Sequence, residues 1–312
     1  MPTRRQFLTG LGALAAGAGV WPLARGQVID VSHRSLRLWD EPGAPWRVGH
    51  VSDLHFSRDI SLAHIREAFD LLLATAPDLI CVTGDFITDE APDPAAFVGE
   101  LRRLARAAPT LACLGNHDGG RWSAGRGGPR EPDAVIEMLR DAGLQLLHER
   151  SERITLKNRT AEVAGVADLW SHPIEVSAER FGPSPHPRIV LAHNPDTKDE
   201  LARVPWNLML SGHTHGGQIR LPWVGGRLTA PVRDDRYIEG LLPWEGRHLH
   251  ISRGVGCLYG LRQPGITGPV VAGADAELGQ LAIEQAGNAR ADRMAVVDHH
   301  PWVAFTQAVD LF

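Results

Sequence analysis

The chain has 312 residues, a net charge of -5 and an isoelectric point near 6.3, which excludes a generally basic surface for nucleic acid or anionic lipid. Hydrophobic residues make up 43% and charged residues 22%, as in ordinary soluble globular proteins, and the length suffices for a large buried core. The three cysteines are odd in number, so they do not form a disulfide framework.

Residues 1–26 have the order of an export signal. Arg4 and Arg5 precede Phe7, and residues 11–20 form an apolar run rich in glycine and alanine. This order resembles a twin-arginine signal, whereas the run is short for a membrane span. We therefore expect the twin-arginine export machinery as a partner and an exported location, periplasmic or elsewhere in the cell envelope. Cleavage of the signal, or its retention as a membrane anchor, stays open.

Strands and helices alternate through the first half of the chain. Short apolar runs predict strands, and apolar residues at helical spacing predict helices. The expected elements are strands at 28–39 and 47–52, a helix at 60–75, a strand at 79–83, a helix at 94–108, a strand at 110–114 and a helix at 132–142. Polar clusters follow these strands from residue 47 onward. This is the layout of an α/β fold, in which sites form at the carboxyl ends of strands.

The second half is richer in strands. We expect a hairpin of strands at 153–156 and 162–167, then strands at 188–192, 208–210, 218–221, 237–242 and 248–252. The most economical architecture is one α/β domain over residues 27–286, a two-layer mixed β-sheet sandwich flanked by α-helices. Residues 287–312 are expected to form a C-terminal tail of unclear role.

Five polar clusters carry the chemistry. They are Asp53-x-His55, Gly84-Asp85, Gly115-Asn116-His117-Asp118, His193 and Gly212-His213-x-His215. Carboxylate, amide and imidazole groups suit Mn, Fe or Zn ions, and the neighbouring glycines let the backbone come close to such ions. Any one cluster alone is as well explained by a turn or a structural histidine. The full ordered set, with each member after an apolar run, indicates a metal site.

This ordered set resembles the calcineurin-like metallophosphoesterase superfamily, over roughly residues 47–256. The segments 52–55, 165–170 and 211–219 are similar to a branch of bacterial phosphohydrolases and phosphodiesterases, several of them exported by the twin-arginine route. The resemblance implies a metal-dependent phosphohydrolase, with phosphodiesterase activity favoured. It also implies a phosphate-ester substrate and two divalent or mixed-valence metal ions, Mn, Fe or Zn.

The resemblance also implies a role for each motif residue. The ligands implied for one ion are Asp53, His55, Asp85 and His215, and those for the other are Asp85, Asn116, His193 and His213. Asp85 would bridge the ions, and a hydroxide between them would attack phosphorus. His117 would assist the leaving group, and Asp118 would orient His117.

Other functions stay open at this stage. A lipid or nucleotide-sugar pyrophosphatase, of the UDP-diacylglucosamine type, would need an apolar groove beside the metals. Trp206, Trp223 and Trp244 would either form a lip for such a substrate, with association at a membrane surface, or pack in the core. A non-catalytic metal-binding protein would have no use for the pair of His117 and Asp118. A nuclease is disfavoured by the acidic balance, so no nucleic acid partner is expected.

Overall fold

The computed structural model describes residues 29, 31–40, 43–217, 219–220, 227–228, 232–256 and 309–311. The predicted signal, most of the predicted tail and Trp223 lie outside these residues. Among the residues described, no helix combines the length and the apolar character needed to cross a membrane.

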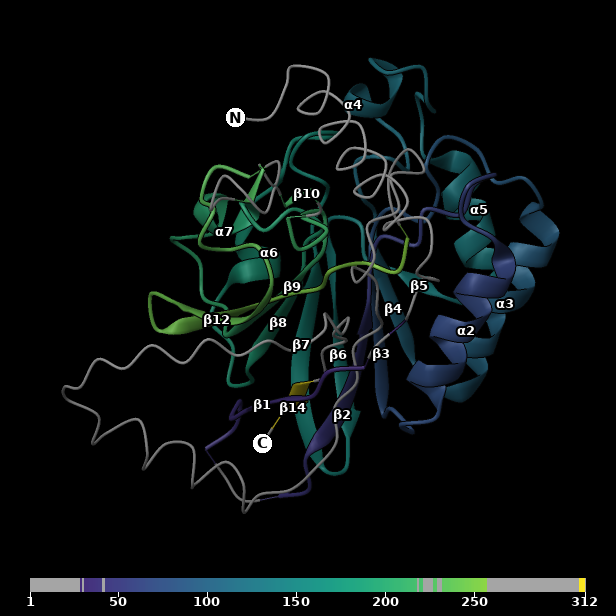
Figure 1. Ribbon diagram of the computed structural model, residues 1–312. Coiled ribbons are helices and arrows are strands. Elements are labelled where there is room, and N and C mark those ends of the chain that lie inside the picture. The colour runs from purple at the N-terminus through teal and green to yellow at the C-terminus, as the bar shows by residue number, and fades with distance from the viewer. Residues whose placement is uncertain are drawn as a thin grey trace, which may run out of the picture.

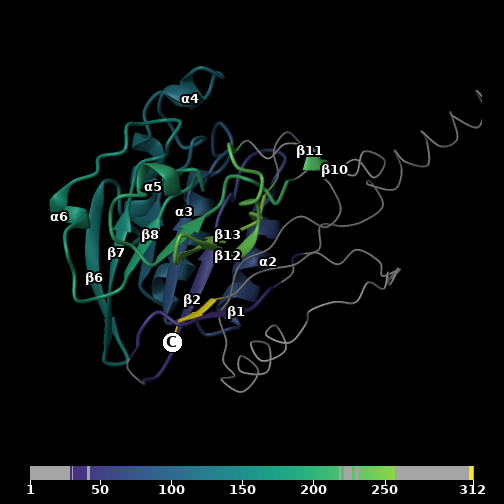
Figure 2. The ribbon, with the colours of Figure 1, turned by 90° about the vertical axis from the view of Figure 1, so that its left-hand side faces the viewer.

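Two six-stranded sheets lie face to face at the centre, with helices on their outer sides (Figures 1 and 2). The first sheet has the order β1 (Arg34–Leu36), β14 (Val309–Leu311), β2 (Trp46–Val51), β3 (Leu79–Thr83), β4 (Thr110–Cys113) and β5 (Gln145–Leu146). The strands β2 to β5 run parallel, and β14 pairs antiparallel with β2. The carboxyl ends of the parallel strands therefore share one edge of the sheet.

The second sheet is also mixed. Its order is β12 (Gly240–Trp244), β13 (Arg247–Ile251), β9 (Leu208–Ser211), β8 (Arg188–Leu191), β7 (Arg159–Gly165) and β6 (Arg150–Leu156). The four inner strands run parallel, and the two edge strands are antiparallel to their neighbours. The turn of the β6–β7 hairpin is Lys157-Asn158, and both residues have positive φ, as a type I′ turn requires. Two short strands, β10 (Ile219–Arg220) and β11 (Arg227–Leu228), pair with each other.

Three helices cover the outer face of the first sheet (Figure 1): α2 (Leu62–Leu73), α3 (Pro94–Ala107) and α5 (Asp133–Ala142). Ser61 and Asp93 begin α2 and α3 by accepting backbone N–H groups, which satisfies donors that a helix leaves unpaired. Single-turn helices lie in loops: α4 (Arg121–Ala124), α6 (Ala178–Phe181) and α7 (Thr197–Glu200).

Buried side chains form three layers. Phe69 and Leu101 belong to the layer between the helices and the first sheet. Val48 and Ile189 belong to the layer between the two sheets. Trp206 packs on the outer face of the second sheet, where its ring stacks on that of Trp244 at 5.5 Å and 7°. These two tryptophans therefore pack with the core, which is the second of the two alternatives left open for them.

The predicted fold class is confirmed, and most elements lie within a few residues of their predicted bounds. The expected strand at 28–39 is wrong in extent, because among the described residues of this range only Arg34–Leu36 form a strand. The predicted tail contributes β14 to the first sheet, which the sequence did not indicate. A three-residue strand is too short to show the alternation by which strands are recognised in a sequence.

Substitution of Gly165 by alanine tests the close contact between the two sheets. A Cβ at this position would lie 1.9 Å from the carbonyl oxygen of Leu147, a backbone group that cannot move aside cheaply. We expect Gly165→Ala to lower the free energy of unfolding by roughly 1–3 kcal/mol in urea denaturation. The matched control is Gly99→Ala in the exposed part of α3, where a Cβ meets nothing within 4 Å. It should stabilise by roughly 0.5–1 kcal/mol, and equal effects at both glycines would contradict the packing argument.

Candidate metal centre

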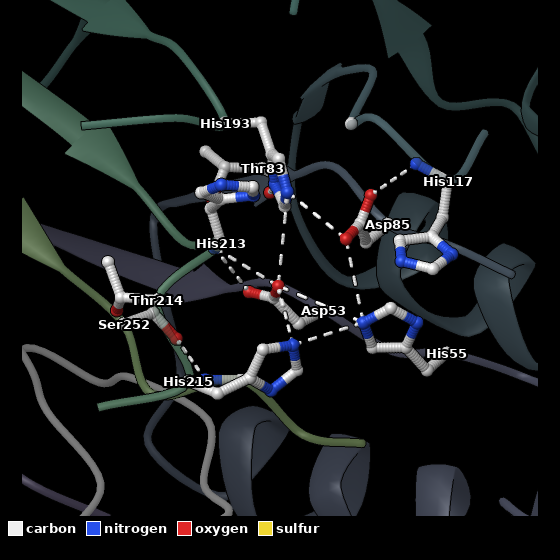
Figure 3. A network of polar contacts seen from close by, with 12 residues as sticks. Asp53, His55, Thr83, Asp85, His117, His193, His213, Thr214, His215 and Ser252 are labelled. Atoms are coloured by element: carbon white, nitrogen blue, oxygen red, sulfur yellow. Dashed lines mark hydrogen bonds and ion pairs between the residues drawn. The ribbon is translucent and has the colours of Figure 1, made fainter. Parts of the chain in front are cut away.

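The predicted ligands meet at the carboxyl ends of strands from both sheets. Asp53 and His55 follow β2, Asp85 follows β3, Asn116 follows β4, His193 follows β8, and His213 and His215 follow β9. The side chains of these aspartates and histidines converge between the two sheets, with the carboxylates at the centre and the imidazole rings around them (Figure 3). The structure therefore brings together the aspartates and histidines that the sequence analysis selected as ligands.

Asp53 and Asp85 organise the centre. Asp85 Oδ2 lies 3.1 Å from His193 Nε2 and 3.5 Å from His55 Nε2. Asp53 Oδ1 lies 3.3 Å from His215 Nε2, and the Nε2 atoms of His55 and His215 are 3.1 Å apart. Both carboxylates and these imidazoles are buried. Such short distances between buried ligand atoms are what a shared cation site needs.

The residues present fit two divalent cations. Potential ligand atoms within 4.8 Å of one another form three overlapping sets: Asp53, His55 and His215; His55, Asp85 and His117; and Asp85, His193 and His213. Asp85 belongs to two sets, as a bridging ligand would. The buried Oδ1 of Asn116 has no hydrogen-bond partner among the described residues, as is expected of an oxygen that binds a metal. Which of these residues bind each ion stays a prediction.

The pKa shifts of the buried groups at the centre also favour bound cations. Burial raises the pKa of Asp53, and the nearby Asp85 raises it further. Burial lowers the pKa of His55 well below its usual value. Burial would also lower the pKa of His193, but Asp85 and Asp53 raise it well above its ordinary range. Divalent cations stabilise such a site, because they offset the carboxylate charge and bind neutral imidazoles.

The backbone at the predicted ligands is strained. Five of them have φ angles in the left-handed region: Asp53 (51°), His55 (48°), Asp85 (55°), His213 (69°) and His215 (47°). Residues with a Cβ rarely adopt this conformation, and such strain concentrates at functional sites. Gly115 allows the chain to pass close to the Asp85 carboxylate, since a Cβ there would lie 2.2 Å from Asp85 Oδ1. The approach of the glycines to the ions themselves stays a prediction.

The predicted role of Asp118 is wrong. Its carboxylate does not orient His117 but accepts backbone N–H groups from the loops that follow β3 and β4. The donors are Asp85 at 2.9 Å, Phe86 at 2.7 Å and Gly115 at 2.7 Å. A buried carboxylate with several N–H donors is well solvated by the backbone, so Asp118 stabilises the strained turn that carries Asp85.

His117 is oriented by a backbone carbonyl. Its Nδ1 lies 2.8 Å from the carbonyl oxygen of Thr88, and the backbone N–H of His117 donates to Asp85 Oδ1 at 2.9 Å. A carbonyl only accepts, so Nδ1 carries a hydrogen and Nε2 is the nitrogen left for the site. His193 Nδ1 donates in the same way to the carbonyl of Thr83 at 2.8 Å. The sequence could not indicate either partner, because every residue has a backbone carbonyl.

Asp168 was not selected as a site residue. It is buried beyond the carboxyl end of β7, and its Oδ1 accepts N–H groups of Trp170 at 2.9 Å and Ser171 at 3.0 Å. Burial raises the pKa of Asp168 to about 6. An acidic residue just after a strand was the available signal, the same one that selected Asp53 and Asp85.

A groove of about 470 Å³ opens at Thr88, the residue whose carbonyl binds His117. It is lined by Ser57, Arg58, Asp59, Thr88, Asp89, Glu90, Gly127, Gly128 and Pro129. Thr88 belongs both to this groove and to the hydrogen bond with His117. Its lining carries three acidic side chains and one basic side chain, so it has an excess of negative charge.

Residues 47–217 match the family described as calcineurin-like phosphoesterase. The chain belongs to this family. As a calcineurin-like phosphoesterase with buried clusters of histidine and aspartate, it is a metallophosphoesterase, which confirms the family predicted from the ordered motifs.

Named relatives extend the match over most of the chain. The chain is 38% identical to phosphodiesterase YaeI of Escherichia coli, over 84% of this chain and 95% of YaeI. It is 31% identical to the metallophosphoesterase YkuE of Bacillus subtilis, over 81% of this chain and 91% of YkuE. It is 26% identical to UDP-2,3-diacylglucosamine pyrophosphatase LpxG of Chlamydia trachomatis, over 67% of this chain and 78% of LpxG.

Substitution of Asp118 by asparagine tests its corrected role. The asparagine side chain has one oxygen that accepts hydrogen bonds and one NH₂ group that donates them. The NH₂ group would therefore face backbone N–H groups that now donate to one of the two carboxylate oxygens. We expect Asp118→Asn to lose bound metal, measured by elemental analysis of the purified protein, and to lower activity roughly 10–100-fold. The matched control is Asp93→Asn at the start of α3, where asparagine caps equally well and metal content should not change. Full metal content with reduced turnover in Asp118→Asn would favour the original assignment instead.

Proposed function

We propose that this metallophosphoesterase is a phosphodiesterase that uses two divalent or mixed-valence metal ions, Mn, Fe or Zn. The observation that carries the proposal is the position of Asp85 in two adjoining sets of ligand atoms, one with His55 and His117 and the other with His193 and His213. The relative from E. coli that is named a phosphodiesterase supports a diester substrate, because it is 38% identical over 84% of this chain and 95% of its own length.

The proposed ligands fall into two groups, one for each ion. Asp53, His55 and His215 would hold one ion, and Asn116, His193 and His213 the other, with Asp85 common to both. Bound there, the ions would act as Lewis acids toward the phosphoryl oxygens and lower the pKa of a water molecule.

His117 acts on the leaving group. It carries a proton at Nε2 and gives it to the leaving oxygen as the ester bond breaks. The Thr88 carbonyl accepts the Nδ1–H, which keeps Nε2 directed into the site. Asp118 keeps Asp85 in place by accepting its backbone N–H.

The alternative substrate is a lipid-linked nucleotide sugar, the class named for the relative from C. trachomatis. Two observations favour a less hydrophobic diester. The groove at Thr88 carries three acidic side chains and one basic side chain, and Val176 is the exposed large hydrophobic side chain among the described residues. Acidic side chains along the groove disfavour the burial of acyl chains there.

Hydrolysis of bis-p-nitrophenyl phosphate tests the proposed activity. Protein stripped of metal should be inactive and should recover activity when Mn²⁺ is added, with a lower rate on p-nitrophenyl phosphate. We expect His117→Ala to keep its metals and to lose roughly 10²–10⁴-fold in kcat, since it removes the proton donor. Asp85→Ala should lose metal as well as activity.

The control for these variants is His248→Ala, at the opposite end of β13 from the site, which should keep full activity. A monoester preferred over the diester would contradict the diesterase. Bound metal without turnover on either substrate would point to the lipid-linked substrate or to a non-catalytic metal-binding protein.

We also propose that the protein is exported by the twin-arginine route. The support is the sequence of residues 1–26, with Arg4 and Arg5 before an apolar run. In a bacterial host, the full chain should appear in the periplasm or at the membrane surface. The variant with Arg4→Lys and Arg5→Lys should stay in the cytoplasm, and fractionation followed by immunoblotting measures both. Equal export of the two proteins would argue against the twin-arginine route.

A further inference from the structure

Two tryptophans lie against the histidines of the centre. The ring of Trp122 lies 4.6 Å from that of His117, and the ring of Trp170 lies 4.3 Å from that of His213 at 87° (centroid distances). The two indole rings are 6.0 Å apart and 26° from parallel. Trp122 and Trp170, here called the tryptophan wall, thus form a continuous aromatic surface from His117 to His213.

The tryptophan wall is built into the fold. Arg121 Nε donates to the carbonyl of Trp170 at 2.8 Å, and the N–H of Arg121 donates to the carbonyl of Ser171 at 3.4 Å. Asp168 accepts the N–H of Trp170, and the Ser171 hydroxyl donates to the carbonyl of Asn116 at 3.4 Å. These bonds join the loop after β4 to the loop after β7. The wall is therefore already formed before any substrate binds.

Core packing does not account for these two side chains. The three buried clusters contain Trp39, Trp46 and Trp206, with Trp244 packed against one of them, but neither member of the tryptophan wall. Both members are only partly buried. An indole ring has no ligand atom for a metal, so its contribution beside the centre is a rigid apolar face.

A cation completes this surface. The guanidinium carbon of Arg126 lies 4.1 Å from the centroid of the Trp122 ring. Arg126 is exposed, so this contact holds its positive charge next to the tryptophan wall. Because the guanidinium lies over the Trp122 ring, an aromatic ring that binds on this face of Trp122 displaces Arg126 or stacks on its guanidinium plane.

We propose that the tryptophan wall binds a flat aromatic ring carried by the leaving group of the diester. The proposal rests on the proposed function, because it is His117 that protonates the leaving oxygen and Trp122 that contacts His117. A planar π system fits such a surface better than an acyl chain, since stacked rings gain an electrostatic contribution as well as buried area. An aryl alcohol and a nucleoside both offer this ring.

Binding of non-reacting analogues tests the proposal. Each pair of analogues shares its phosphoryl group, held by a C–P bond that cannot be hydrolysed, and differs in the ring. The first pair is phenylphosphonate and cyclohexylphosphonate, and the second is the methylenephosphonate analogues of adenosine 5′-monophosphate and of ribose 5-phosphate, in which CH₂ replaces the ester oxygen. Affinities are measured by calorimetry on the metal-loaded protein, with methylphosphonate as the reference for the phosphoryl site. We expect the aromatic member of at least one pair to bind roughly 3- to 10-fold tighter. A preference in the first pair identifies an aryl leaving group, and one in the second pair a nucleoside.

Substitutions assign that preference to the tryptophan wall. Trp122→Ala should lose the aromatic preference but keep its metals and its affinity for methylphosphonate, and Trp122→Phe should retain most of the preference. Trp170→Ala should weaken it as well.

Equal affinities within both pairs, or a preference that survives in Trp122→Ala, would overturn this inference and leave the proposed function intact. Failure of every analogue to bind, methylphosphonate included, would overturn the proposed function and this inference with it.

Discussion

The burial of two carboxylates, Asp53 and Asp85, is the constraint on which the arrangement of this end of the molecule depends. An ionised carboxylate away from water is costly unless a positive charge or several hydrogen-bond donors compensate it. The imidazoles of His193 and His215 approach the two carboxylates at 3.1 and 3.3 Å. This composition, acidic groups surrounded by nitrogen ligands, is the one that divalent cations stabilise.

The two sheets make this convergence possible, and Asp118 supports it. Parallel strands in both sheets end at the same edge, so short loops from β2, β3, β4, β8 and β9 reach one point. The left-handed backbone at Asp53 and Asp85 is costly, and it persists because the surrounding structure determines it. Asp118 contributes by binding the N–H groups of both Asp85 and Gly115, which ties the loop after β3 to the loop after β4.

The substrate specificity that we propose rests on residues other than the predicted metal ligands. His117 depends on the carbonyl of Thr88, a residue that also lines the groove with the excess of acidic side chains. The tryptophan wall depends on hydrogen bonds between the loop after β4, which carries Asn116, and the loop after β7, which carries no predicted ligand. Relatives of one family can therefore share the same cations and differ in substrate, because the loops around the centre vary independently of the strands beneath it.

The sequence by itself determined the fold class, most of the strands and helices, and the residues that meet at the centre. These features are local, since an apolar run followed by an aspartate or histidine is visible along the chain. Tertiary structure alone decided that Asp118 binds backbone N–H groups, that Thr88 orients His117, that Val309–Leu311 joins the first sheet, and that Trp122 lies beside Trp170. The reason is physical: backbone carbonyls and N–H groups are the same in every residue. Which of them a side chain meets depends on how distant segments pack, and no local pattern records that.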